Sequence, residues 1–145
     1  MTVELQLETA VRLMIAALLS MLIGLDRERR QLTTHLHTAG LRTHMLVGIG
    51  ACLFTILSFY AFPGNSTATI AANIVTGVGF LGAGTIIRRS DSVSDLTTAA
   101  SIWATAAIGM ASGIGAWLLA TLATLIIWFV LAVLRRFEPE KQQSR

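Results

Sequence analysis

The chain has 145 residues, of which 54% are hydrophobic and 13% are charged, and its formal net charge is +3. Soluble domains carry about 25% charged residues, whereas here residues 43–87 and 96–134 contain no Asp, Glu, Lys or Arg. Two uncharged runs of this length cannot be hidden in one water-soluble core, so the composition excludes a soluble domain. It predicts an all-α, polytopic integral membrane protein.

The first predicted element is a membrane span near residues 7–25. Asp26 bounds it, and about 20 apolar residues are needed to cross the hydrocarbon layer. Counting back from Asp26 places Arg12 inside the apolar layer, four residues after Glu8. This order favours a helical ion pair. We therefore expect Arg12 to snorkel to the outer edge and pair with Glu8, with an ion or proton site as the alternative.

A charged segment follows this span and contains Asp26, Arg27 and Glu28, with Arg42 before the next span. Proteins usually hold Mg²⁺ by one or two carboxylates, so Asp26 and Glu28 are candidate metal ligands. Because they are two residues apart, they point to different faces of a regular helix, and a joint site requires the helix to end there. We prefer a charged stop in which Asp26 or Glu28 pairs with Arg42.

Histidine and cysteine give no metal motif in this sequence. His35, His37 and His44 lack the spacing of a zinc site, and Cys52 is the only cysteine. We expect the histidines in a solvated loop, with a pH-responsive loop as the alternative. No cofactor is predicted, with weakly held Mg²⁺ as the one exception.

The first uncharged run is interrupted by Pro-Gly-Asn-Ser at 63–66, which predicts spans near 43–62 and 67–87. The second of these contains G-x-G-x-x-G, but the pattern lies inside an apolar span without a preceding strand, so a dinucleotide site is excluded. Its glycines permit close helix packing or a broken helix lining a cavity. Asn73 and Thr76 are polar intramembrane candidates one turn earlier. The four glycines are Gly77, Gly79, Gly82 and Gly84.

The second uncharged run divides at Gly-Ile-Gly, which predicts spans near 96–113 and 115–134 and a cytoplasmic tail at 138–145. Gly109 and Gly113 form a small-xxx-small pair suited to helix packing. Hydroxyl side chains on this fourth span either flank a polar path beside Asn73 or bond to their own helix. They are Thr97, Thr98, Ser101 and Thr105. No nucleophile, base and orienting acid converge, so no enzyme activity is expected.

The basic residues predict the orientation of the five spans. Ten of the eleven Lys and Arg residues fall in segments 26–42, 88–95 and 135–145, which all lie on one side. By the positive-inside rule, the N-terminus is outside and the C-terminus is in the cytoplasm.

Four segments carry a family signature in fixed order: RLMIAALLSMLIGLDRERR, AGLRTHMLVGIGACLF, IVTGVGFLGAGTI and LTTAASIWATAAIGMASG. Together they resemble the MgtC/SapB family of bacterial inner-membrane proteins. The resemblance implies a five-span domain over residues 1–137, in the lipid bilayer of the inner membrane, and a homo-oligomer, with a dimer as the first expectation. It implies adaptation to low magnesium, acid and life inside host cells, and so a link to virulence.

The same resemblance implies that such a protein acts by binding other inner-membrane proteins, the proton-translocating ATP synthase among them. The first alternative is a transporter or channel for Mg²⁺ or another cation, and a second is a purely structural scaffold. No nucleic-acid partner is expected.

Three departures from the family pattern bear on these expectations. Many members have a soluble cytoplasmic domain after the last span, which we do not expect here. The segment GNSTATIAAN lacks the Asp and Arg that members often carry before the glycine-rich span. Asp95 replaces the glycine of the familiar GLTTAA, and we expect its side chain to cap the fourth span.

Overall fold

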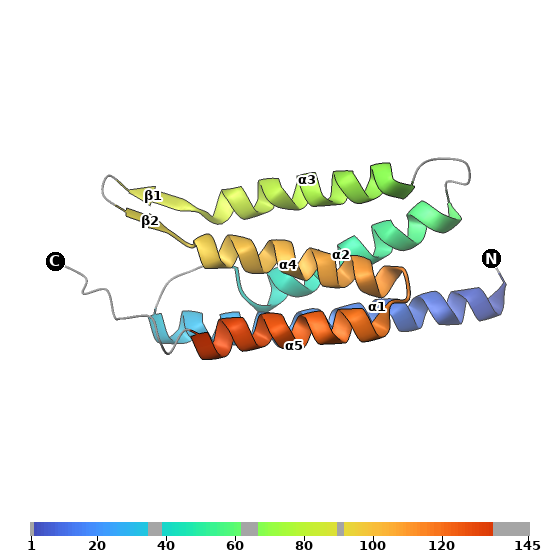
Figure 1. Cartoon of the computed structure of the whole chain (residues 1–145), viewed down its shortest axis with the longest axis horizontal. Coiled ribbons are helices and arrows are strands. Elements are labelled where there is room, and N and C mark those ends of the chain that lie inside the picture. The colour runs from blue at the N-terminus through green and yellow to red at the C-terminus, as the bar shows by residue number, and fades with distance from the viewer. Residues whose placement is uncertain (1, 35–38, 62–66, 90–91, 135–145) are drawn as a thin grey trace.

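A computed structural model describes the backbone of residues 2–34, 39–61, 67–89 and 92–134. Five helices lie side by side along the long axis, and a short antiparallel hairpin joins the third helix to the fourth (Figure 1). The helices are α1 (Val3–Thr34), α2 (Leu41–Tyr60), α3 (Thr67–Thr85), α4 (Leu96–Gly113) and α5 (Trp117–Val133), and the strands are β1 (Ile87–Arg89) and β2 (Ser92–Ser94). The predicted all-α class therefore holds apart from this hairpin.

Helix α1 is longer than the predicted first span. We expected the membrane span to end at Asp26, and that bound stays a prediction, while the helix itself continues to Thr34. Arg and Glu are good helix formers, so the charged segment that marks the end of an apolar span does not break the helix. The bounds of the other four helices lie close to the predicted spans.

Among the described residues, three helical stretches are long and apolar enough to cross a membrane: Val3–Arg30, Leu41–Tyr60 and Thr67–Thr85. Helix α5 is a shorter apolar helix. These features agree with a membrane protein, while the count of five spans and their orientation stay predictions.

Helix α4 is the centre of the bundle. It packs against each of the other four helices, and half of its 18 residues are buried. Helix α3 lies on one side of α4, and α1 and α5 lie on the other (Figure 1). The end of α1 therefore meets the beginnings of α2 and α4 at one end of the bundle.

Glycines bring the backbones of α2 and α4 into close contact. A Cβ atom added at Gly113 would lie 2.8 Å from the carbonyl oxygen of Cys52 and 2.8 Å from Cβ of Thr55. A Cβ atom added at Gly109 would overlap the carbonyl oxygen of Gly48. This is the close approach that small residues allow between helices in lipid, as predicted for Gly109 and Gly113.

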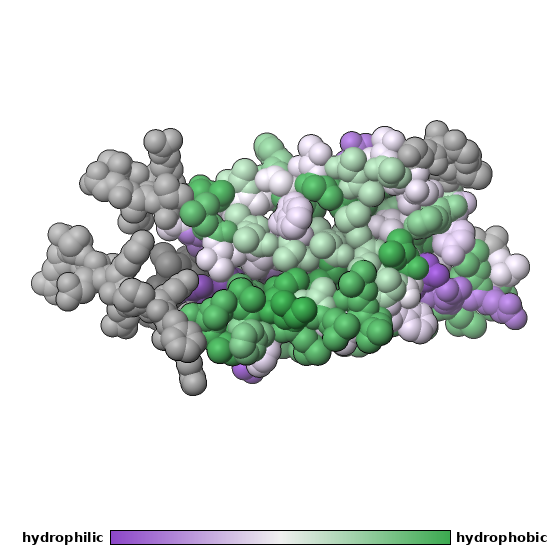
Figure 2. All heavy atoms as spheres, viewed as in Figure 1, coloured by the Kyte–Doolittle hydropathy of each residue, from purple (hydrophilic) through white to green (hydrophobic). Residues whose placement is uncertain are grey.

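The outer surfaces of α5 and α3 differ in character. The surface over α5 is strongly hydrophobic, whereas the surface over α3 is paler (Figure 2). Exposed residues of α5 include Leu118, Leu119, Leu122, Leu125, Ile126 and Phe129. Exposed residues of α3 include Asn73, Thr76, Gly77, Gly79, Phe80 and Gly84.

Candidate functional site

A buried polar cluster joins three helices where α1 ends and α2 and α4 begin. Its side chains come from Arg27 of α1, His44 of α2, and Thr98 and Ser101 of α4, and we call this cluster the polar junction. Arg27 is 3% exposed and His44 is 0% exposed. Arginine and histidine are seldom buried this completely, and when they are, they need hydrogen-bond partners.

Hydrogen bonds connect the polar junction across long sequence separations. The Arg27 guanidinium donates from Nη2 to Thr98 Oγ1 over 3.1 Å. His44 contacts Ser101 Oγ through Nε2 at 2.9 Å and the Gly40 carbonyl oxygen through Nδ1 at 2.8 Å. Ser101 Oγ donates to the Thr98 carbonyl oxygen at 2.8 Å. These bonds fix α1 and α2 to the first turns of α4.

The two carboxylates beside Arg27 differ in their hydrogen bonding. Glu28 Oε2 accepts a hydrogen bond of 2.9 Å from the backbone N–H of Leu41, the first residue of α2. A negative charge at a helix N-terminus is favourable, so Glu28 of α1 stabilises the start of α2. One carboxylate oxygen of Asp26, Oδ2, is buried and has no hydrogen-bond partner among the described residues.

The predicted pairing of Asp26 or Glu28 with Arg42 was wrong. Arg42 is exposed, and no ion pair joins it to either carboxylate in the described part of the chain. Glu28 instead accepts a hydrogen bond from the backbone of α2. Since α1 continues past both carboxylates, Asp26 and Glu28 point to different faces, which opposes a joint metal site. Within the described residues, no group of three or more His, Cys, Asp or Glu could hold a metal ion.

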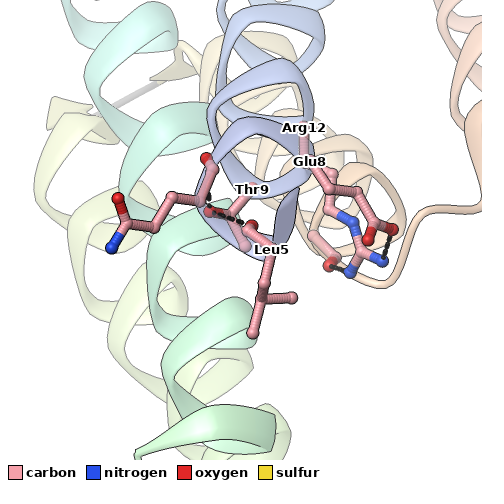
Figure 3. Close-up of polar contacts among 6 residues, drawn as sticks. Leu5, Glu8, Thr9 and Arg12 are labelled. Carbon is pink, nitrogen blue, oxygen red and sulfur yellow. Dashed lines mark hydrogen bonds and ion pairs between the residues drawn. The ribbon is translucent and has the colours of Figure 1, made fainter. Parts of the chain in front are cut away.

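A second polar contact lies at the opposite end of the bundle. Arg12 forms an ion pair with Glu8 and donates from Nη1 to the carbonyl oxygen of Gly113 at 2.7 Å (Figure 3). The Glu8 pairing is the one that the sequence predicted. The Gly113 contact places a cation at the C-terminus of α4, where the helix dipole favours positive charge.

Comparison with known proteins identifies the family. Residues 13–139 match the MgtC family. The chain belongs to the MgtC family. This confirms the resemblance seen in the four sequence motifs.

Several curated proteins are similar to this MgtC-family chain. The Escherichia coli K12 protein named "Putative magnesium transporter YhiD" is 43% identical over 87% of this chain and 60% of its own length. The protein MgtC of Salmonella typhimurium LT2 is 44% identical over 86% of this chain and 52% of its own length. The protein MgtC of Brucella abortus is 42% identical over 88% and 51%, respectively. The chain thus spans about half to three fifths of these relatives. No solved structure matches.

The segment DLTTAA, where this chain departs from the familiar GLTTAA, leads into α4 with an unusual backbone conformation at Asp95. Asp95 has φ 67° and ψ 16°, in the left-handed region where glycine carries no steric cost. Asp95 precedes α4, but its side chain makes no capping hydrogen bond to the helix N–H groups, so that expectation was wrong. Its Oδ1 instead accepts from Thr98 Oγ1 at 3.4 Å. The left-handed conformation accounts physically for the glycine usual at this position of the motif.

The glycine-rich segment of α3 is a continuous helix, so the broken-helix alternative does not describe the structure. A Cβ atom at Gly82 would make ordinary contacts with Ala99 of α4, whereas nothing lies within 4 Å of Cβ atoms built at Gly77, Gly79 and Gly84. Within the described part of the chain, Gly82 is therefore the one of these four glycines whose Cβ position contacts a neighbouring helix, while Gly77 lines the groove between α2 and α3. Close backbone contacts lie instead between α2 and α4, and between Gly24 of α1 and Leu41 of α2.

Of the two alternatives for the hydroxyls of the fourth span, bonding to their own helix describes Ser101 and Thr105, and a polar path beside Asn73 is not assembled. Thr98, Ser101 and Thr105 of α4 are buried, while Thr97 is exposed. Asn73 is exposed on α3 and lines an apolar groove of about 410 Å³ between α2 and α3. Thr76 donates to the Ala72 carbonyl oxygen of its own helix.

Sequence reasoning missed His44 as a site residue. It was grouped with His35 and His37 as part of a solvated loop, but His44 lies buried in the first turns of α2, and that expectation was wrong. His35 and His37 lie outside the described residues. One signal was available in the sequence. His44 lies inside the first uncharged run, whereas His35 and His37 precede that run.

Proposed function

We propose that this MgtC-family chain is a bacterial inner-membrane protein that supports adaptation to low magnesium, acid and life inside host cells by binding other membrane proteins. The first candidate partner is the proton-translocating ATP synthase. The proposed arrangement has five spans, an external N-terminus and a cytoplasmic C-terminus, and the protein forms a homo-oligomer. The family assignment and the magnesium in the name of the Escherichia coli relative support a role linked to magnesium.

The observation that carries this proposal is the hydrogen bonding of the hydroxyl groups buried deep in the bundle. They donate to carbonyl oxygens of their own helices: Thr55 to Ala51, Thr105 to Ser101, Ser112 to Ile108, and Thr124 to Ala120. The hydrogens of these hydroxyls are satisfied within their own helices and the side chains are buried, so they need no ion or water as a partner. Mg²⁺ sheds water reluctantly and is usually held by one or two carboxylates, and helices α2 to α5 carry none between residues 43 and 87 or between 96 and 134. A single protomer is therefore better suited to binding other membrane proteins than to conducting Mg²⁺.

The alternative is cation transport, and one observation favours it. Asn73 exposes an amide on a helix face that carries small residues, and it lines the groove between α2 and α3. A cation route that uses Asn73 would run along the outer surface of the protomer. A second copy of the chain would have to form the other wall of that route.

A flux assay on purified protein in liposomes separates the two functions. We expect no magnesium flux above that of empty liposomes, with or without a membrane potential. In cells lacking the protein, we expect wild-type to restore growth in low magnesium and Asp26→Asn to fail while still inserting into the membrane. Saturable magnesium uptake that Asn73→Leu abolishes would establish the transporter and overturn the binding role.

A further inference from the structure

Asn73 is a polar residue of α3 whose side chain has no partner within the bundle. It is exposed, and its amide makes no hydrogen bond to any residue that the structure describes. Thr76, three residues later, donates to the Ala72 carbonyl oxygen at 2.9 Å and so uses its hydrogen within α3. The amide of Asn73 has two donor hydrogens and an acceptor oxygen, and none of them is used in this way.

Asn73 also lies near the middle of its helix. Thr76 is the central residue of α3, and a rise of 1.5 Å per residue places Asn73 about 4.5 Å from it along the axis. In the five-span arrangement that we propose, this position is inside a hydrocarbon layer about 30 Å thick, beyond the reach of water and lipid headgroups. Acyl chains offer no hydrogen-bond partner, so the amide is satisfied there by a polar group of another protein chain.

The exposed residues around Asn73 follow the spacing of a coiled-coil seam. The members of this seam are four, three, four and three residues apart, and all of them are exposed. They are Thr69, Asn73, Thr76, Phe80 and Ala83. The buried residues of α3, which are Ile74, Val78 and Gly82, lie on the other side of the helix. This is the a/d spacing of a two-stranded coiled coil, with Asn73 and Phe80 at a positions.

The surroundings of the seam allow a second helix to come close. Gly77, Gly79 and Gly84 lie beside it, and nothing is within 4 Å of a Cβ atom built at any of the three. The outer surface of α5 carries large apolar side chains instead, and the two surfaces differ accordingly (Figure 2). Small residues beside a seam favour contact with another helix, because the two backbones can approach closely.

We propose that two copies of this chain pair in parallel through α3, with their Asn73 amides hydrogen-bonded to each other. A two-fold axis places each residue opposite its own copy, and an amide is self-complementary because it both donates and accepts. Copies with one topology have parallel α3 helices, so the axis runs along the membrane normal. A single Asn at an a position fixes the register of such a pair. This inference rests on the proposed function, since it names the interface of the homo-oligomer.

Disulfide cross-linking of the full chain in native membranes tests the interface. Wild-type is the blank, because its one cysteine, Cys52, is fully buried. Thr76→Cys places a thiol on the seam, whereas Val75→Cys places one at the same depth beside Trp103 of α4, where Val75 is 41% exposed. We expect oxidation to convert most of Thr76→Cys into a dimer and to leave wild-type and Val75→Cys monomeric.

The amide pair is tested by dimer affinity in liposomes. Energy transfer between labels on the N-termini is followed as the protein is diluted with lipid. Asn73→Leu should raise the dissociation constant about tenfold, because lipid is as apolar as leucine and the lost interhelical hydrogen bonds are not replaced. Asn73→Gln keeps the amide, and Thr76→Val removes a hydroxyl that bonds within its own helix, so both should stay close to wild-type. Circular dichroism confirms that the helices are intact.

The outcomes separate this inference from the proposed function. Cross-linking of Val75→Cys that equals or exceeds that of Thr76→Cys would overturn the α3 interface and leave the homo-oligomer standing. Equal affinities of Asn73→Leu and Asn73→Gln would overturn the amide pair. A protein that stays monomeric at every lipid ratio would overturn both this inference and the homo-oligomer. Growth in low magnesium and magnesium flux are measured separately, so their results do not decide the interface.

Discussion

Replacing Gly109 with alanine tests the close packing of α2 against α4. The added Cβ would overlap the Gly48 carbonyl oxygen and lie 3.0 Å from the Gly48 carbonyl carbon and 3.1 Å from Cβ of Ala51. These are backbone and near-backbone atoms, which move only if α2 moves. Overpacking typically costs about 1–3 kcal/mol, and this contact belongs at the upper end. The higher helix propensity of alanine offsets about 1 kcal/mol of this cost. We therefore expect Gly109→Ala to lower the free energy of unfolding by about 2 kcal/mol.

Gly77→Ala is the matched control. Nothing lies within 4 Å of a Cβ atom built at Gly77, so this variant gains helix propensity without a clash and should be up to about 1 kcal/mol more stable than wild-type. Because the propensity gain is common to both variants, the difference of about 3 kcal/mol between them measures the clash alone.

The free energies come from unfolding in mixed micelles, with SDS titrated into dodecylmaltoside and helix content followed by circular dichroism. Equal stability of Gly109→Ala and Gly77→Ala would refute the close approach of α2 and α4. A loss in Gly77→Ala alone would place the tight contact on α3 instead.

Three further predictions concern orientation, backbone strain and Arg12. Reporter fusions after Pro63 should be external and fusions after Arg136 cytoplasmic; an external C-terminus would contradict the five-span arrangement. Asp95→Gly should raise the free energy of unfolding by about 1 kcal/mol in the same SDS titration, because the left-handed conformation costs other residues roughly 1–2 kcal/mol; a loss would mean that the Thr98 contact outweighs the strain. Arg12→Met should cost about 1.5–3 kcal/mol through its bond to Gly113, while the exposed Arg42→Met should change stability by less than about 0.5 kcal/mol; equal effects would contradict the role of Arg12 in joining α1 to α4.

The helices could be predicted because their signals are local. Uncharged runs, the Pro-Gly break and the Gly-Ile-Gly break indicated five elements, and Gly115 adopts φ 80° in the turn that follows α4. The hairpin was not predicted, because three-residue strands are too short to show an alternating pattern. The extension of α1 to Thr34 was not predicted, because charge limits a membrane span but does not limit a helix.

The polar junction could not be predicted, because its contacts join residues far apart in the sequence. Arg27 and Thr98 are 71 residues apart, and His44 and Ser101 are 57 residues apart. The sequence placed hydroxyl side chains on or near one face of the fourth span but did not show which of them are buried or which helix they would meet. The Glu8–Arg12 pair was predictable since its partners are one helical turn apart.

The two partners of Arg12 become available at different times during synthesis. Glu8 precedes Arg12 in the chain, so the ion pair can form as soon as α1 is helical. The Gly113 carbonyl follows 101 residues later, after α4 has been made. In the five-span arrangement that we propose, α1 therefore enters the bilayer with its arginine already paired, which reduces the cost of inserting the charge. The late contact with Gly113 then holds the first helix to the last turn of α4, and it can form only once assembly has brought the two helices together.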